Sequence, residues 1–212
     1  MKRFTTLLAS LLIVTSVIAQ NWAPVGENIR TPWAEQVDPA APLQAYPRPQ
    51  MVRADWMNLN GLWDYAITEA SAETFVAQGE ILVPFAIESS LSGVGKRVSK
   101  GEALWYEREF TVPRQWKGKN VLLHFGAVDW HAEVFVNDVF LGEHKGGYDP
   151  FSFDVTPALK KSGRQVIRVK VQDATDNSFQ PRGKQCIINT GIWYTPVTGI
   201  WQTVWLEPVS PA

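Results

Sequence analysis

The chain has 212 residues, 45% of them hydrophobic and 19% charged, which is typical of a globular protein with a sizeable core. Its formal net charge of -1 provides no basic excess to neutralise phosphates, which argues against nucleic acid as a partner. The single cysteine, Cys186, excludes an internal disulfide, and we expect a small buried apolar residue rather than a reactive thiol.

The amino terminus has the pattern of a secretory signal peptide. Lys2 and Arg3 precede an uncharged, mostly apolar run from Phe4 to Ala19 that ends in a small residue. This run is shorter than the roughly 20 apolar residues that a membrane-spanning helix needs. We therefore predict a signal peptide over residues 1–19, a secreted or periplasmic chain, and no membrane segment after cleavage.

Residues 20–54 predict an extended, proline-rich arm. Six prolines fall in this stretch, at positions 24, 32, 39, 42, 47 and 49, without helical or strand periodicity. Proline restricts the residue before it to extended conformations, which disfavours a helix. We expect this arm to wrap a domain over residues 55–209, with residues 210–212 starting a linker or tail.

Beyond the arm the pattern becomes strand-like. Nine short apolar runs are bounded by Gly, Pro, Asn or Asp, over residues 62–68, 81–85, 104–112, 121–125, 132–136, 139–143, 151–155, 165–171 and 203–207. Apolar Ile167, Val169 and Val171 alternate with basic Arg168 and Lys170, which predicts one buried and one solvated face. Asn137-Asp138 suits a two-residue hairpin turn, because both residues tolerate positive φ.

The sequence offers little helix. The best candidate is a short helix over 156–161, opened by Thr156 as its cap and Pro157 at its first position. About nine short strands with almost no helix predict an all-β fold, a β-sandwich of the jelly-roll, galactose-binding-domain-like type.

The many aromatic residues serve either the core or the stacking of sugar rings. Five lie within strand patterns and are expected to pack the sandwich: Trp63, Phe110, Phe125, Phe135 and Trp205. Four lie in or beside predicted loops: Trp130, Trp193, Tyr194 and Trp201. An exposed ring in a loop offers a flat apolar face that the C–H face of a pyranose can cover. For these four, contact with a ligand or another domain and simple loop packing both remain open.

A polar string over residues 180–185 is the second candidate for ligand binding. Arg182, Lys184 and Gln185 gather cationic and amide groups around Gly183, which lets the backbone approach a ligand. Sugar hydroxyls need such donors and acceptors, although a solvated turn is the alternative. The predicted carbohydrate-binding residues are therefore Trp130, Arg182, Lys184, Gln185, Trp193 and Tyr194.

The sequence contains no recognisable catalytic or metal site. Retaining hydrolysis of a glycosidic bond normally requires two carboxylates about 5–5.5 Å apart, and no acidic residue here has neighbours that mark it for that role. The three histidines lack metal-ligand spacing. The acidic stretch 173–177 favours an Asx-rich turn over a calcium loop. We predict no catalytic residue, no metal and no cofactor.

Several motifs, taken together and in order, resemble the amino-terminal sugar-binding domain of glycoside hydrolase family 2. They are Asn58-Leu59-Asn60-Gly61-Leu62-Trp63, Val83-Pro84-Phe85, Trp105-Tyr106-Glu107-Arg108-Glu109-Phe110, the run from Leu122 to Trp130, Gly146-Gly147-Tyr148, and Thr198-Gly199-Ile200-Trp201. The resemblance covers nearly all of residues 55–208, and it implies a jelly-roll domain.

The resemblance also implies a role. The family includes β-galactosidases, β-glucuronidases and β-mannosidases, whose catalytic glutamates come from a (β/α)₈ barrel that follows an immunoglobulin-like domain. We therefore expect this chain to form part of the sugar pocket of a secreted glycosidase, with a β-linked oligosaccharide or polysaccharide and those two domains as partners. The β-galactosidase branch has an acidic sugar contact shortly before the Gly-Ile turn, whereas residues 193–198 here contain none. The alternatives are a free-standing lectin-like module or an inactive truncated fragment.

Overall fold

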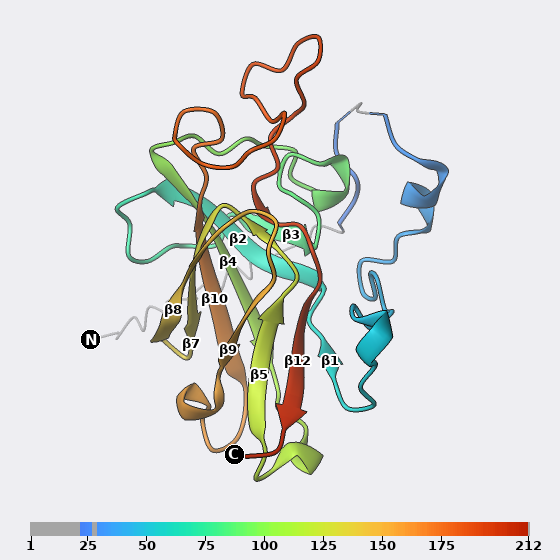
Figure 1. Cartoon of the computed structure of the whole chain (residues 1–212), viewed down its shortest axis with the longest axis vertical. Helices are drawn as coiled ribbons and strands as arrows, with labels where there is room; N and C mark the ends of the chain where they lie inside the picture. The colour runs from blue at the N-terminus through green and yellow to red at the C-terminus, as the bar shows by residue number, and fades with distance from the viewer. Residues whose placement is uncertain (1–21, 27–28, 212) are drawn as a thin grey trace, which may run out of the picture.

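The computed structural model describes residues 22–26 and 29–211, and the predicted signal peptide lies outside them. The described residues form two main antiparallel sheets that pack face to face (Figure 1). The four-stranded sheet has the order β1 (Met57–Asn58), β12 (Val204–Val209), β5 (Asn120–Phe125) and β9 (Phe151–Asp154). The six-stranded sheet has the order β3 (Gly79–Val83), β2 (Gly61–Glu69), β4 (Glu102–Phe110), β10 (Gln165–Gln172), β7 (His131–Val136) and β8 (Val139–Lys145).

Short elements complete the sandwich. A two-stranded sheet pairs β6 (Val128–Asp129) with β11 (Gly199–Ile200) at one end. The helical elements of the described residues are 3₁₀ turns, namely η1 (Pro32–Gln36), η2 (Pro49–Met51), η3 (Ser90–Ser92), η4 (Arg114–Trp116) and η5 (Thr156–Ala158). None of the described helices is long and apolar enough to cross a membrane.

The predicted all-β sandwich is confirmed. All nine predicted strands are present, with boundaries that differ by at most two residues. The hairpin turn is also confirmed, because Asn137 and Asp138 have φ values of 50° and 66°. The predicted helix over 156–161 is wrong, since only a 3₁₀ turn forms there. The Thr156 hydroxyl accepts a hydrogen bond from the Val121 backbone N–H of β5 and does not cap a helix.

The core lies between the two main sheets. Trp63, Phe110 and Phe125 are buried in it, as predicted. Phe135 is a correction, because it lies half-buried on the outer face of the six-stranded sheet. Its strand turns Ala132, Val134 and Val136 into the core, so the alternate position faces outward.

The arm, defined here as residues 29–54, lies along the β1 edge of the four-stranded sheet in Figure 1. Trp205 is buried on the outer face of that sheet, where the Arg48 guanidinium of the arm lies 5.0 Å from its ring. The ring of His124, on the neighbouring strand β5, stacks on it at 4.9 Å. Trp205 is therefore buried as predicted, although under the arm. The predicted domain boundaries near residues 54 and 209 stay predictions.

Candidate functional site

The longest connection between strands, residues 173–198 between β10 and β11, is called here the 173–198 loop. It forms the orange and red projections at the upper end of Figure 1. Its two halves lie side by side, because the Tyr194 N–H donates to the Lys184 carbonyl at 2.9 Å and the Cys186 N–H donates to the Tyr194 carbonyl at 3.0 Å. The fold therefore brings residues 182–186 next to residues 193–194.

Cys186 corrects one expectation. It is only half-buried, and its Sγ donates to Asp176 Oδ2 at 2.8 Å. The outer part of the loop is too far from the core to bury a thiol completely. The hydrogen bond to Asp176, followed by burial, raises the pKa of this thiol, so the thiol stays protonated.

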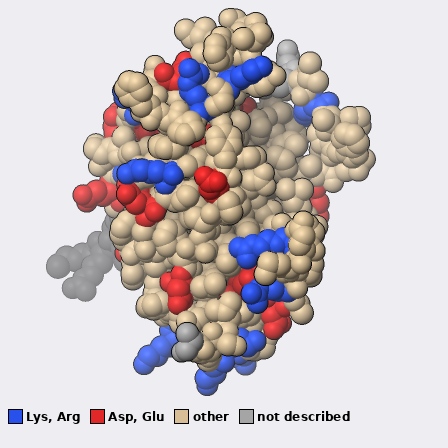
Figure 2. Space-filling view, viewed as in Figure 1, with Lys and Arg blue, Asp and Glu red and all other residues tan. Residues whose placement is uncertain are grey.

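Two pairs of a cation and an aromatic ring form at the exposed end of the loop. The Arg182 guanidinium lies 5.6 Å from the centre of the Trp193 ring, and Lys184 Nζ lies 5.7 Å from that of Tyr194. Both rings remain accessible, with 41% of Trp193 and 64% of Tyr194 exposed. Figure 2 shows Lys and Arg side chains at this end of the molecule, with acidic side chains beside them. Four of the six predicted binding residues therefore share one exposed surface.

Gln185, the fifth predicted residue, points into the protein. Its Nε2 donates to Asp129 Oδ2 at 3.0 Å, and its Oε1 accepts from the Val197 N–H at 2.6 Å. The Arg182 guanidinium donates to the Gln185 carbonyl at 2.5 Å. Gln185 thus holds the loop on the sandwich, and its side chain is buried with both ends of its amide hydrogen-bonded.

Trp130, the sixth predicted residue, lies half-buried between β6 and β7. Its carbonyl accepts from the Gly146 N–H at 3.2 Å. In the described part of the chain Trp130 has no hydrogen bond or ring contact with the other five predicted residues, but it directly follows Asp129, to which Gln185 binds. Its link to the loop is therefore indirect.

Two aromatic residues at the same end were not predicted to act together. Trp201 Nε1 donates to the Gly147 carbonyl at 2.8 Å, and its ring meets that of Tyr148 edge to face at 6.4 Å. Half of the Tyr148 side chain is exposed. The motif Gly146-Gly147-Tyr148 was the available signal, because paired glycines allow the close backbone approach seen here. A Cβ at Gly147 would lie 2.6 Å from the Asp129 carboxyl carbon.

A buried carboxylate closes the base of the loop. Asp173 Oδ1 accepts from the Thr175 N–H and from Gln180 Nε2, both at 2.7 Å, and its Oδ2 accepts from the Thr198 hydroxyl at 2.8 Å. The predicted Asx turn is thus confirmed. Because residues 173 and 198 are the two ends of the loop, this side chain fixes its stem. In the described part of the chain, no cluster of His, Cys, Asp or Glu has an arrangement suited to a metal ion.

Two further buried carboxylates lie at this end of the sandwich. Glu88 Oε2 accepts from the Thr198 N–H at 2.9 Å, while Glu88 Oε1 and Asp129 Oδ1 have no hydrogen-bond partner in the described chain. Burial raises the pKa of both Glu88 and Asp129 to about 7, and the charge of Asp173 adds to the effect. Near neutral pH these groups therefore carry protons that exposed carboxylates have lost.

This burial predicts a pH dependence of stability for Glu88→Gln. Because the pKa of Glu88 is higher in the folded state than in the unfolded state, the contribution of Glu88 to wild-type stability is full below about pH 4.3 and falls as the pH rises through 7. The variant cannot ionise at this position, so its free energy of unfolding should fall by about 2–3 kcal/mol less than that of wild type. Urea unfolding at pH 5 and pH 8 measures it, with the exposed Glu80→Gln as the control. Parallel pH curves for Glu88→Gln and wild type would contradict the expectation.

The fold defines a β-sandwich domain with one long loop at its end, and comparison with known proteins gives the family. Residues 92–207 match the model of the sugar binding domain of glycosyl hydrolases family 2. The chain belongs to this family, which confirms the resemblance seen in its motifs.

Individual relatives agree with this assignment. A β-galactosidase of Thermoanaerobacter pseudethanolicus is 38% identical over 104 residues, which are 49% of this chain and 13% of that protein. A β-glucuronidase of Formosa agariphila is 34% identical over 108 residues, or 51% of this chain and 11% of the relative. The solved structure of Bacteroides uniformis β-glucuronidase superimposes with a TM-score of 0.53 at 26% identity, covering 74% of this chain and 18% of that one. The chain thus spans less than a fifth of the length of these proteins.

Proposed function

We propose that the exposed surface made by Arg182, Lys184, Trp193 and Tyr194 forms one wall of a sugar-binding pocket in a glycosidase that acts on β-linked saccharides. The observation that carries this proposal is the pairing of a cation with an accessible aromatic ring, twice, on a loop whose stem is fixed by Asp173. A preorganised surface of this kind loses little entropy when a ligand binds.

The chemistry of the surface suits a saccharide. The flat faces of Trp193 and Tyr194 can cover the C–H face of a pyranose, while Arg182 and Lys184 can donate hydrogen bonds to its oxygen atoms. The two positive charges favour a sugar with a carboxylate over a neutral one of the same shape. This preference agrees with the β-glucuronidases among the relatives, although a β-galactosidase is also among them.

In this proposal the chain supplies binding, and bond cleavage belongs to other parts of a parent enzyme. Retaining glycosidases cleave with two carboxylates, one acting as acid and base and the other as nucleophile. The buried carboxylates Glu88, Asp129 and Asp173 instead hold the loop, and none of them is exposed to a substrate. The signal peptide predicted over residues 1–19 supports secretion of this protein.

Trp193→Ala tests the proposal. The variant should weaken binding of methyl β-glucuronide at least tenfold, or about 1.4 kcal/mol, because it removes the ring that stacks on the sugar and that positions Arg182. Calorimetric titration measures the affinity, with methyl β-galactoside as the neutral comparison. Phe179→Ala is the matched control, since Phe179 is a fully exposed aromatic residue of the same loop.

Two outcomes would contradict the proposed function. The first is equal affinity of wild type, Trp193→Ala and Tyr194→Ala for every sugar tested. The second is clear turnover of chromogenic β-glycosides by the purified chain, which would assign bond cleavage to residues of this domain.

A further inference from the structure

The outer face of the six-stranded sheet carries a row of aromatic rings. Phe75, on the connection between β2 and β3, stacks on Trp105 of β4 at 5.4 Å. The Trp105 ring lies 6.4 Å from that of Phe135 on β7, which lies 5.3 Å from that of Phe140 on β8. Within this row Trp105 is nearly buried, at 3% exposed, whereas Phe140 at its end is 56% exposed. The row thus leads from a recess to the surface.

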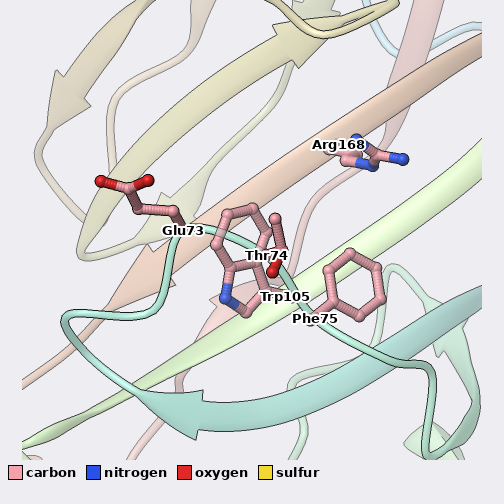
Figure 3. A pocket seen from close by; sticks show the side chains of 5 residues that line it. All are labelled: Glu73, Thr74, Phe75, Trp105 and Arg168. Atoms are coloured by element: carbon pink, nitrogen blue, oxygen red, sulfur yellow. The ribbon is translucent and has the colours of Figure 1, made fainter.

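A hollow of about 100 Å³ lies at the recessed end, lined by Glu73, Thr74, Phe75, Trp105 and Arg168. Figure 3 shows the first three residues on the β2–β3 connection, which passes over the sheet, with Trp105 on β4 and Arg168 on β10. The hollow therefore combines two aromatic rings with a carboxylate, a hydroxyl and a guanidinium group. A hollow of about 100 Å³ is smaller than the roughly 300 Å³ at which enclosed small-molecule pockets begin, so it can receive only part of a ligand, with the rest lying on the surface beside it.

The walls of this hollow are held by hydrogen bonds. Lys170 Nζ donates to the Ala72 carbonyl at 2.9 Å, and Gln172 Nε2 donates to the Ala70 carbonyl at 3.2 Å, which fixes the β2–β3 connection to β10. Trp105 Nε1 donates to the Thr68 hydroxyl at 3.1 Å and locks the floor. The site is thus formed before any ligand arrives.

Two carboxylates hold Arg168 in place and offset its positive charge. Its Nε donates to Glu107 at 2.5 Å, and its Nη1 donates to Asp138. This leaves Nη2 as the nitrogen available to a ligand. Lys170 Nζ, 5.3 Å from the centre of the Trp105 ring, adds a second cation beside Arg168. The carboxylates of Glu73, Glu107 and Asp138 outnumber these two cations, so the hollow has no positive excess that would hold a phosphate or another anion.

We propose that this hollow is a second carbohydrate-binding site, for a neutral β-linked oligosaccharide. One sugar ring would place its C–H face against Phe75 and its hydroxyls against Glu73, Thr74 and Arg168. A purely apolar ligand would leave these polar groups without partners, which costs binding energy. The following sugar rings would reach Phe135 and Phe140 along the aromatic row.

This site goes beyond the proposed function, because it lies on the sheet face and shares no residue with the 173–198 loop. In a glycosidase that acts on a polymer, a second contact with the same chain would raise the effective concentration of substrate at the first. The two sites therefore have separate ligand preferences and separate tests.

Nuclear magnetic resonance of the full chain tests the second site through the Trp105 indole N–H and the backbone amides of Thr74 and Phe75. Cellotetraose or β-1,4-galactotetraose should shift these signals in a saturable manner, with a Kd of about 1 mM, as expected for a shallow site. Phe75→Ala should weaken this binding at least tenfold, and Phe75→Leu, which keeps apolar volume without a flat ring, should weaken it as well. Val76→Ala, at an exposed neighbouring position, is the matched control.

Three results would overturn the proposal. These signals could fail to shift with any tetrasaccharide, or the shifts could vanish in Trp193→Ala and persist in Phe75→Ala, which would mean one site at the loop. They could also move with protein concentration alone, which would identify a contact between copies of the chain. Failure of the loop proposal is distinguishable, because it concerns methyl β-glucuronide and Trp193→Ala.

Discussion

Gly199→Ala should destabilise the domain by about 3 kcal/mol or more. Gly199 has a φ of +93°, and a Cβ there would lie 2.0 Å from the Tyr106 hydroxyl oxygen and 3.0 Å from Leu104 Cδ2. Both neighbours are fully buried on β4, so neither can move without disturbing the core. The Tyr106 hydroxyl also accepts a hydrogen bond from the Ile200 N–H at 3.2 Å, which the shift would break.

Urea unfolding measures this loss, and Gly118→Ala separates its causes. Gly118 has a similar φ of +81°, but a Cβ there meets open space. The control should therefore lose only about 1 kcal/mol, the cost of the left-handed backbone for a non-glycine residue. Equal losses in the two variants would show that the contact with Tyr106 does not matter.

Glu207→Gln should cost about 2 kcal/mol and release the arm. Glu207 is 1% exposed, and it accepts from the Tyr46 hydroxyl at 2.5 Å and from Trp205 Nε1 at 2.7 Å, while Arg53 Nε lies 2.9 Å from its other oxygen. Glutamine has only one acceptor oxygen, so one of these partners loses its bond. Water reaches part of Arg53, which keeps the cost below that of a fully buried pair.

The pH dependence of the free energy of unfolding is a second measurement for Glu207→Gln. Burial alone would raise the pKa of Glu207, but hydrogen bonds from Tyr46 and Trp205 and nearby positive charges outweigh it and hold the pKa below its usual value. The contribution of Glu207 to stability is therefore present above its pKa in the unfolded chain. It is lost as the pH falls through its lower pKa in the folded chain.

Thermal unfolding and limited proteolysis of the arm would follow both effects. The exposed Glu109→Gln, which breaks only a surface ion pair with Arg164, is the control and should cost under about 1 kcal/mol. An arm equally resistant to proteolysis in Glu207→Gln and wild type would argue against its attachment through this carboxylate.

Local patterns made most of the fold predictable. Strands such as β10 carry their own alternation of buried and half-buried residues, so the sequence identifies them without knowledge of their neighbours. The predicted solvated face of β10 fails at Lys170, which is buried because its ammonium donates to the Ala72 carbonyl of the β2–β3 connection. The face that an aromatic residue occupies is harder to predict, because it depends on what covers each sheet. Trp205 is covered by the arm and Phe135 by Trp105 and Phe140, and neither cover is visible in the strand itself.

The exposed residues of the candidate site were predicted from the sequence, whereas the buried residues that hold them in place were not. Arg182, Lys184, Trp193 and Tyr194 are close in sequence, so their chemistry suggested a common surface. Gln185 was also predicted to contact a ligand. The sequence does not reveal that its side chain binds Asp129, which is 56 residues away. The contact between Glu88 and Thr198 spans 110 residues, and only the sandwich topology brings them together.

Because the stem of the 173–198 loop is fixed, the stability of the domain depends little on the residues at the tip of the loop. Asp173, Thr198 and Gln185 hold the base, whereas Ile188 and Ile192 near the turn are largely exposed. Lengthening a flexible segment is inexpensive, since each doubling adds only about 0.6 kcal/mol of closure entropy. The Arg97 guanidinium donates to the Ile187 carbonyl and to Asn189 Oδ1, so the support of the loop extends to these residues. Residues 190–192 are therefore a natural position at which peptides of different length and sequence can be grafted to give the scaffold new recognition properties.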